Sequence, residues 1–373
     1  MNARTQKGVS LVELMVAVVI ASLTVVVVLE VLATYNARKR TITIGNDAEI
    51  NAAAGLFELE RELRMAGAGL TLPNGFACNA GVNLYFDDQT VLDGAPLPLV
   101  RIIDGGAGPD RITLIRSDAN FGPAPATIVA AMAGPDANVV VDWNADLERG
   151  DVFLAGSPDG NRICTLMQLT RAPQAGPGGV SLEHSSAGSE YNPENYGASF
   201  DSAIRYEIGD SITNLGRFGL RTYAVLCSDG NAPGLDNACN LVALDALAAP
   251  DPPALADGES IASQVVDLQA WYGVAPANSQ TVNEWVDATG ATWAAPTDAN
   301  QRRIKALRLA IVTRGNLERE VVSPDELVLW DDDPDSDDAA TERKIALDDD
   351  QRRYRYKVLT VIVPLINVIW AGV

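Results

Sequence analysis

The sequence predicts an α+β protein in which a long N-terminal helix, partly transmembrane, packs against an antiparallel, β-rich globular head. Three observations lead to this prediction. Residues 14–29 form an apolar run without charge, proline or glycine. Residues 47–66 continue with apolar side chains at helical spacing. From residue 70 onward, glycine, proline, asparagine and aspartate separate many short apolar segments, which is typical of antiparallel strands joined by turns.

The stretch that contains the apolar run is long enough to cross a bilayer, for which a helix of roughly 17–25 residues is needed. Its hydroxyls, Ser22 and Thr24, can bond back to the preceding helical turn. A secretory signal peptide is cut after its apolar run. Here the cleavable-looking junction, Lys7-Gly8-Val9 at the end of a short basic leader, lies before the run. The apolar helix would therefore remain in the mature chain.

Glu13 is an ionisable group at the start of this apolar helix. A charge in such a place is costly and is usually kept for a partner. After cleavage at Gly8, Glu13 would lie about one helical turn from the new amino group of Val9. We therefore expect Glu13 to be a docking residue and not a general base.

The helix is expected to continue to residue 66, which gives a length of about 87 Å at 1.5 Å per residue. Its second half carries an apolar seam at Ala52, Leu56, Leu59, Leu63 and Ala66. Gly45 and Gly55 are expected to bend it, and Gly67 to Gly69 to end it. The predicted divisions are a leader at 1–8, a membrane or filament-core helix at 9–34, the second half of the helix at 35–69 and the head at 70–373.

Alternating or short apolar segments predict strands throughout the head. They cover residues 110–117, 151–155, 164–170, 203–208, 220–226, 266–274, 305–313 and 354–363. Residues 172–199 and 247–258 are rich in turn-forming residues and are expected to be loops. The apolar C-terminal stretch is too short for a second membrane span and is broken by Pro364, so it is expected to be a last buried strand.

The composition excludes several classes of function. The 373 residues include 28 Lys and Arg against 49 Asp and Glu, a net charge of −21, which argues against nonspecific nucleic-acid binding. A single histidine, His184, and the absence of a Cys-x-x-Cys motif exclude the usual zinc sites. His184 lies in a glycine- and serine-rich segment and is expected in solvent, not in a catalytic triad. We expect no enzymatic activity.

Four cysteines in a chain exported past the membrane indicate two disulfides, and three pairings can be drawn. Cys227 and Cys239 flank a turn-rich segment. This favours a bond between them, which would leave Cys78 with Cys164. The sequence leaves the other pairings open.

An acidic run is the one metal-like pattern in the sequence. Its carboxylates stand at alternate positions, with a glutamate at the twelfth place: Asp331, Asp333, Asp335, Asp337 and Glu342. This spacing echoes the oxygen ligands of a calcium loop. Ser336 stands where such a loop needs glycine, and Pro334 restricts the backbone. A solvated acidic loop is the favoured interpretation and calcium binding the alternative; no other cofactor is expected.

The N-terminal pattern, Gly8-Val9-Ser10-Leu11-Val12-Glu13 followed by an apolar helix, resembles the class III signal of type IV pilins and pseudopilins. The resemblance implies cleavage between Gly8 and Val9 by a prepilin peptidase, followed by N-methylation of the new amino terminus. It also implies that Glu13 pairs with the terminal amine of a neighbouring subunit. Most members of the family have phenylalanine at the first mature position, where this chain has Val9.

Segments of the head resemble PilW-type minor pilins of the type IV pilus. These segments are ELRMAGAG at 62–69, VVDLQAWYGV at 265–274, RIKALRLAIVTRG at 303–315 and RRYRYKVLTVIVPLIN at 352–367. The terminal strand of the family often ends in Pro-Leu-Arg-Asn, whereas this chain has Ile366 in place of the arginine. The resemblance covers both ends of the chain well and residues 75–200 poorly.

The resemblance implies a minor pilin of a complex that primes pilus assembly and supports adhesion and twitching motility. Its partners would be other minor pilins, the major pilin, the prepilin peptidase and the assembly platform. The helix would lie in the inner membrane with the head in the periplasm, and later in an extracellular filament. A type II secretion pseudopilin of the GspJ kind and a calcium-assisted tip adhesin are the alternatives.

Overall fold

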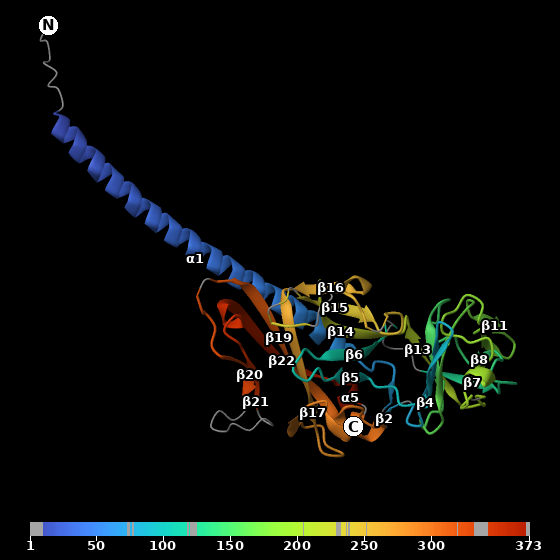
Figure 1. The fold of residues 1–373 in the computed structure, drawn as a ribbon. Helices are drawn as coiled ribbons and strands as arrows, with labels where there is room; N and C mark the ends of the chain where they lie inside the picture. Colours follow the sequence, from blue (N-terminus) through green and yellow to red (C-terminus); the bar gives the residue numbers. More distant parts are fainter. Residues whose placement is uncertain are drawn as a thin grey trace, which may run out of the picture.

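The computed structural model describes residues 10–72, 75–76, 78–117, 119, 125–203, 205–228, 233–235, 237, 239–250, 252–318, 320–331 and 342–370. Helix α1 (Leu11–Met65) extends far out of a β-rich head (Figure 1). The last described element, α5 (Ile366–Trp370), packs against α1 and β19 (Ile304–Leu317). The predicted α+β organisation is confirmed. The long helix is continuous, and it ends where the sequence changes to Gly67 and Gly69, both of which have positive φ.

Two sheets lie next to α1. The five-stranded sheet has the order β16 (Glu259–Ser263), β15 (Cys239–Asp245), β14 (Gly219–Cys227), β6 (Arg111–Arg116) and β5 (Val100–Ile103). The four-stranded sheet has the order β18 (Glu284–Val286), β17 (Val265–Val274), β19 (Ile304–Leu317) and β22 (Tyr354–Pro364). The second half of α1 packs chiefly on β22 and β19, and also on β16 and β6.

A nine-stranded sheet forms the end of the head that lies away from α1 (Figure 1). Its order is β11 (Gln174–Gly176), β12 (Gly179–Leu182), β8 (Val139–Val141), β7 (Ala126–Ala130), β13 (Ser211–Gly216), β9 (Val152–Gly156), β10 (Cys164–Gln168), β3 (Val82–Phe86) and β4 (Gln89–Ala95). Strand β10 is parallel to β3, whereas the other described strand pairs are antiparallel.

Short elements complete the described chain. They are the pairs β1 (Thr71–Leu72) with β2 (Gly75–Phe76) and β20 (Glu326–Asp331) with β21 (Glu342–Ala346), the helices α2 (Tyr196–Ser199), α3 (Gly290–Trp293), α4 (Asp298–Gln301) and α5 (Ile366–Trp370), and the 3₁₀ turns η1 (Leu255–Asp257) and η2 (Gln351–Arg353).

The main hydrophobic core lies between α1 and the sheets. The predicted helical seam at Ala52, Leu56, Leu59, Leu63 and Ala66 is buried in it, as are Leu114, Leu241 and Leu309 from the neighbouring strands. One face of the nine-stranded sheet also contributes, through residues such as Leu154 and Leu166. The opposite face of that sheet covers a second core that includes Phe153 and Met167.

Gly55 allows close packing between α1 and the neighbouring sheets. A Cβ atom added at Gly55 would lie 3.1 Å from Leu241, 3.2 Å from Ile311 and 3.3 Å from Ala262. These contacts are tighter than ordinary van der Waals contact, so the missing side chain lets the helix approach both neighbouring sheets. The same absence of a side chain costs the helix roughly 1 kcal/mol relative to alanine.

Most of the predicted strands are present, with two corrections. Residues 203 and 205–208 form no strand, because the backbone N–H of Glu207 donates to the side chain of Asp210 at 2.7 Å and not to a neighbouring strand. Tyr206 is fully buried, with its hydroxyl 2.9 Å from Thr165 Oγ1. The expected loop at 172–199 contains β11, β12 and α2.

The C-terminal strand also differs from its prediction. It lies at the edge of its sheet and is half-buried: Val363 is buried, whereas Ile362 is 50 % exposed. Helix α5 follows Pro364, which an edge strand tolerates.

Candidate functional site: the exposed half of the N-terminal helix

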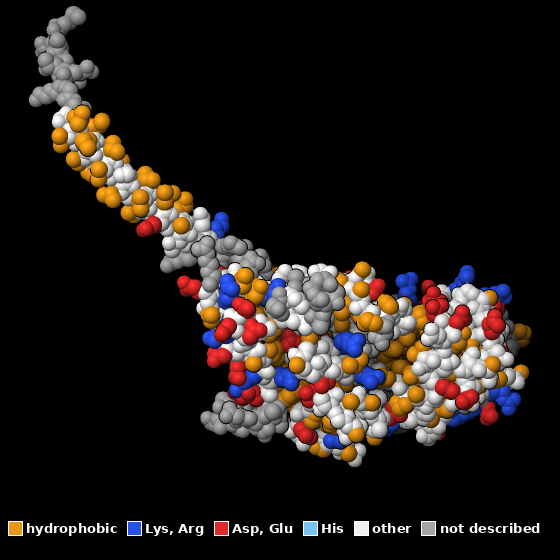
Figure 2. Space-filling model, viewed as in Figure 1, with side chains coloured by type: hydrophobic (Ala, Val, Ile, Leu, Met, Phe, Trp, Pro, Cys, Tyr) orange, Lys and Arg blue, Asp and Glu red, His pale blue; other side chains and the backbone are white. Residues whose placement is uncertain are grey.

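The first half of α1 has no contact with the head. Figure 2 shows its hydrophobic side chains on a rod that projects away from the rest of the molecule. Leu11 is 74 % exposed and Val31 is 64 % exposed, and the large apolar residues between them are exposed on all sides of the helix. By length and composition, the segment Leu11–Asn36 could cross a membrane; its most apolar 18-residue stretch has a mean hydropathy of 2.8. An apolar surface of this size requires lipid or other helices around it.

The serine and threonine hydroxyls of this segment are bonded within the helix. The hydroxyls of Ser22, Thr24 and Thr34 donate to the backbone oxygens of Val19, Ile20 and Glu30 at 2.9, 2.8 and 2.9 Å. A helix whose hydroxyls bond to its own backbone presents no unsatisfied donor to lipid or to a neighbouring helix. The segment therefore suits a low-dielectric environment.

Glu13 lies in the first turn of α1, three residues after the N-cap Ser10. The unpaired backbone N–H groups at a helix N-terminus favour a negative charge nearby. Glu13 is exposed, so a group of another molecule can reach it. The predicted cleavage residues, Gly8 and Val9, lie outside the described residues.

The C-terminal end of α1 is held by a residue that the sequence did not single out. Asn367 Nδ2 donates to the backbone oxygens of Met65 and Ala66 at 3.3 and 3.0 Å. These carbonyls belong to the last helical turn, which has no partners within the helix. The side chain of Asn367 thus joins the end of the chain to the end of α1. The sequence feature that could have pointed to this role is a polar asparagine directly after an apolar C-terminal strand.

Both disulfides of the favoured pairing are present in the structure. Cys78 is bonded to Cys164 across a separation of 86 residues, and Cys227 to Cys239 across 12 residues. The second bond joins facing residues of β14 and β15. The first ties the segment before β3 to the start of β10, the strand that runs parallel to β3.

The acidic run lies between β20 and β21, and only its ends are described. Asp331 and Glu342 face each other in the register of this hairpin, and Glu342 forms an ion pair of 2.6 Å with Lys344. Asp333, Asp335 and Asp337 lie outside the described residues. Among the residues that the structure does describe, no group of three His, Cys, Asp or Glu side chains could hold a metal ion. Calcium binding by this loop stays a prediction.

His184 is buried and not in solvent, so that prediction is wrong. It is 3 % exposed, its Nε2 lies 2.9 Å from the backbone oxygen of Ala137, and its ring meets Tyr196 edge to face at 5.3 Å. Burial lowers the pKa of His184. The histidine belongs to the second core because tertiary packing closes over a segment that the composition marks as a loop.

A bare apolar half-helix, an acidic residue in its first turn and a second half packed in a β-rich head are together the arrangement that the resemblance to type IV pilins implies. Sequence comparisons agree with this class. Residues 3–29 match the prokaryotic N-terminal methylation motif, and residues 237–367 match type IV pilus-assembly protein W, the PilW family. The resemblance to PilW-type pilins is thereby confirmed. None of the curated proteins matches the chain, and no solved structure matches it.

The PilW match begins just before β15 and ends in α5, so it covers the four-stranded sheet and the hairpin β20–β21. The nine-stranded sheet lies outside both matched segments. The chain therefore combines a pilin-type helix and a PilW-type C-terminal part with a large β-rich portion between them.

Proposed function

We propose that this chain is a minor pilin that joins a priming complex for type IV pilus assembly. It is a structural subunit and not an enzyme. The observation that carries the proposal is the division of α1 into a half seated in the head and a half that is exposed and apolar. The PilW and methylation-motif matches support a role in the pilus.

In this proposal the exposed half of α1 has two successive environments. It first lies in the inner membrane, with the head in the periplasm, and waits there after cleavage at Gly8 by the prepilin peptidase. It then moves, through the assembly platform, into a bundle formed by the helices of other minor pilins and the major pilin. Both environments cover the same apolar side chains, so the transfer needs no refolding of the helix.

Glu13 gives the bundle its register in this proposal. In a low-dielectric bundle, an unpaired carboxylate is strongly unfavourable, and a neighbour's methylated terminal amine would neutralise it. Only one stagger between two helices brings these groups together. Glu13 thus selects the arrangement of subunits, whereas the apolar residues around it supply most of the buried area.

The test is the variant Glu13→Ala, with Glu30→Ala as its matched control at the other end of the exposed segment. We expect Glu13→Ala to be processed at Gly8 but to co-purify with partner pilins roughly tenfold less or worse, because breaking a buried ion pair costs about 3–5 kcal/mol. Glu30→Ala should assemble normally. Normal incorporation of Glu13→Ala would contradict the docking role.

Deletion of the gene separates the proposed function from its alternatives. Loss of surface pili with intact secretion supports the priming role. Lost secretion with intact pili would instead identify a pseudopilin of the type II system. Surface binding by the protein in the absence of pili would identify an adhesin, and equilibrium dialysis against calcium would test whether the acidic loop assists it.

A further inference from the structure

A pocket lies where the chain passes from the nine-stranded sheet into the five-stranded sheet. Its volume is about 410 Å³, and three arginines and two acidic residues line it: Arg116, Arg217, Arg221, Asp245 and Glu259. Arg116 ends β6, Arg217 lies between β13 and β14, and Arg221 lies in β14. The chain has a net charge of −21, whereas this pocket is lined by more arginines than acidic residues.

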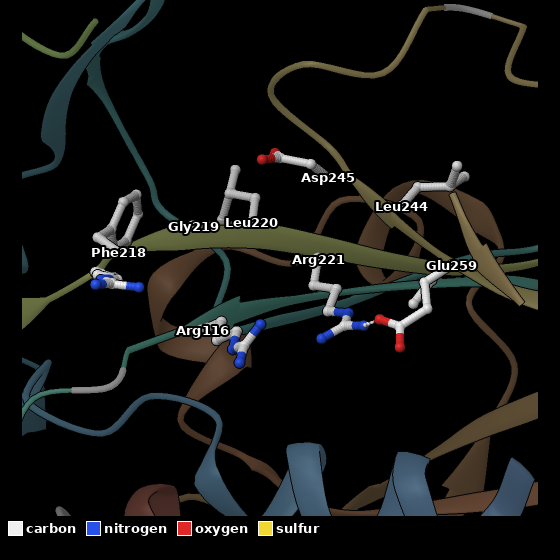
Figure 3. Close-up of a pocket in the computed structure, with 10 residues that line it drawn as sticks. Arg116, Phe218, Gly219, Leu220, Arg221, Leu244, Asp245 and Glu259 are labelled. Carbon is white, nitrogen blue, oxygen red and sulfur yellow. Dashed lines mark hydrogen bonds and ion pairs between the residues drawn. The ribbon is translucent and has the colours of Figure 1, made fainter. Parts of the chain in front are cut away.

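The strand register explains how the guanidinium groups come to share this space. Arg116 faces Gly219 across the β6–β14 pair, so its side chain lies on the same face as that of Arg221, two residues further along. Nothing lies within 4 Å of the position that a Cβ at Gly219 would occupy. Figure 3 shows Arg116, Arg221 and Glu259 on one side of β14, with Leu220 on the other. The glycine thus leaves a gap between two arginines.

The charges in the pocket are unequally satisfied. Arg221 Nη2 is paired with Glu259 Oε2 at 2.7 Å. Asp245 Oδ1 accepts a hydrogen bond of 3.0 Å from the backbone N–H of Leu247. Arg116 is exposed and forms no hydrogen bond or ion pair with any residue that the structure describes. Its guanidinium therefore keeps its donors available to a group that enters the pocket.

The backbone around the pocket is fixed before any ligand arrives. The hydroxyl of Tyr191 donates to the oxygen of Phe218 at 2.8 Å, and the N–H of Ala246 donates to the oxygen of Leu220 at 2.7 Å. Ser117 Oγ donates to the oxygen of Leu215 at 2.7 Å. Binding to a preorganised site loses less conformational entropy than binding to a mobile one.

We propose that this pocket binds a small anionic ligand that carries carboxylate or phosphate groups. Guanidinium groups bind both kinds of oxyanion through paired N–H donors. The volume lies within the range of small-molecule sites, roughly 300–1,000 Å³. The three arginines lie outside both matched segments, and the proposal does not depend on the role of the chain in a pilus.

The experiment is calorimetric titration of the full-length protein in detergent with citrate, a carboxylate probe, and separately with inorganic phosphate. We expect one site per chain for at least one probe, with an affinity that falls as ionic strength rises. Arg116→Gln should weaken binding roughly tenfold or more, and Arg116→Lys less, since lysine keeps the charge but loses the planar fork. The probe that binds more tightly identifies the ligand chemistry.

Arg111→Gln is the matched control. Arg111 begins the same strand, is likewise exposed, and lies outside the pocket, so its removal changes the net charge equally. Unchanged binding in Arg111→Gln supports a specific pocket. If both variants weakened binding of the probe equally, the net charge of the protein alone would explain the effect, and the proposal would be overturned. Absence of binding by both probes at millimolar concentration would overturn it as well.

Discussion

Asp110 is a carboxylate buried in the head. It is 1 % exposed, and its two oxygens accept hydrogen bonds from the backbone N–H groups of Gly105 and Ala270 at 2.9 and 2.8 Å. Burial raises the pKa of Asp110 from 3.8 to about 7, since the two hydrogen bonds offset only part of the desolvation and the charges of Asp104 and Asp287 add to it. The residue joins the loop before β6 to β17.

This raised pKa predicts a pH dependence of stability. A carboxyl group whose folded pKa exceeds its unfolded value binds more protons when folded, so its stabilising effect is complete below pH 3.8 and is lost as the pH rises to about 7. We expect the Asp110 contribution to the free energy of unfolding to fall across this window. Chemical unfolding of the full-length protein in detergent at a series of pH values, compared with Asp110→Asn, measures it.

In Asp110→Asn the titrating group is absent, so its curve should be flatter between these pH values than that of the unchanged protein. Asp104→Asn is a control for the neighbouring charge. It keeps the titration of Asp110 and removes only a minor cause of the shift. Identical slopes for Asp110→Asn and the unchanged protein would contradict the assignment.

At the scale of elements, the packing of α1 against the two sheets depends on the absence of a side chain at Gly55. A leucine at this position would overlap Leu241 and Ile311, which belong to two different sheets. We therefore expect Gly55→Leu to destabilise the head by about 1–3 kcal/mol, the usual cost of overpacking. The free energy of unfolding in denaturant measures the effect.

Ala54→Leu is the control for that variant, because Ala54 is the adjacent residue and lies on the exposed face of α1. The same bulk added there should leave stability nearly unchanged. If Gly55→Leu and Ala54→Leu lowered the free energy of unfolding equally, the close packing of Gly55 against the sheets would not be important for stability.

The elements also differ in how far the sequence predicts them. Strand β17 was expected from alternating apolar residues, yet all ten of its residues are buried. One face of β17 turns to the main core, through Leu268 and Tyr272, and Trp271 on the other face meets Trp330 of the hairpin β20–β21. The sequence of β17 does not indicate that its second face is buried, because the hairpin that covers this face comes much later in the chain.

At the scale of the whole molecule, the exposed half of α1 and the head are independent in their contacts, since none of the apolar segment is buried against the head. We expect a chain that begins at residue 37 to keep its folded head and to stay in solution without detergent. The full chain should require detergent. Circular dichroism and size-exclusion chromatography of both proteins measure this difference.

The segment that only the full chain contains, Leu11–Asn36, supplies the control, because it should add helical signal without altering the thermal midpoint of the head. A shortened chain that unfolds at a clearly lower temperature would show that the exposed segment stabilises the head. That result would contradict the division of α1 into a seated half and a bare half.

The sequence by itself determined the helix, its buried seam and the position of Glu13. Each of these rests on a pattern local to the chain: an uninterrupted apolar run, a helical spacing, and a carboxylate that directly precedes the apolar run. Local patterns are sufficient for a long helix because its periodicity repeats over many turns. The β-rich character of the head followed from turn residues and short apolar segments in the same way.

Other features depend on contacts between distant parts of the chain, and only the tertiary structure shows them. The burial of His184, the contact of Asn367 with the end of α1, and the meeting of Arg116 with Arg221 all join segments that lie far apart along the chain or on different strands. The order of nine strands in the distal sheet has the same origin. Pairing between distant strands is selected by the packing of the whole molecule, and no local spacing encodes it.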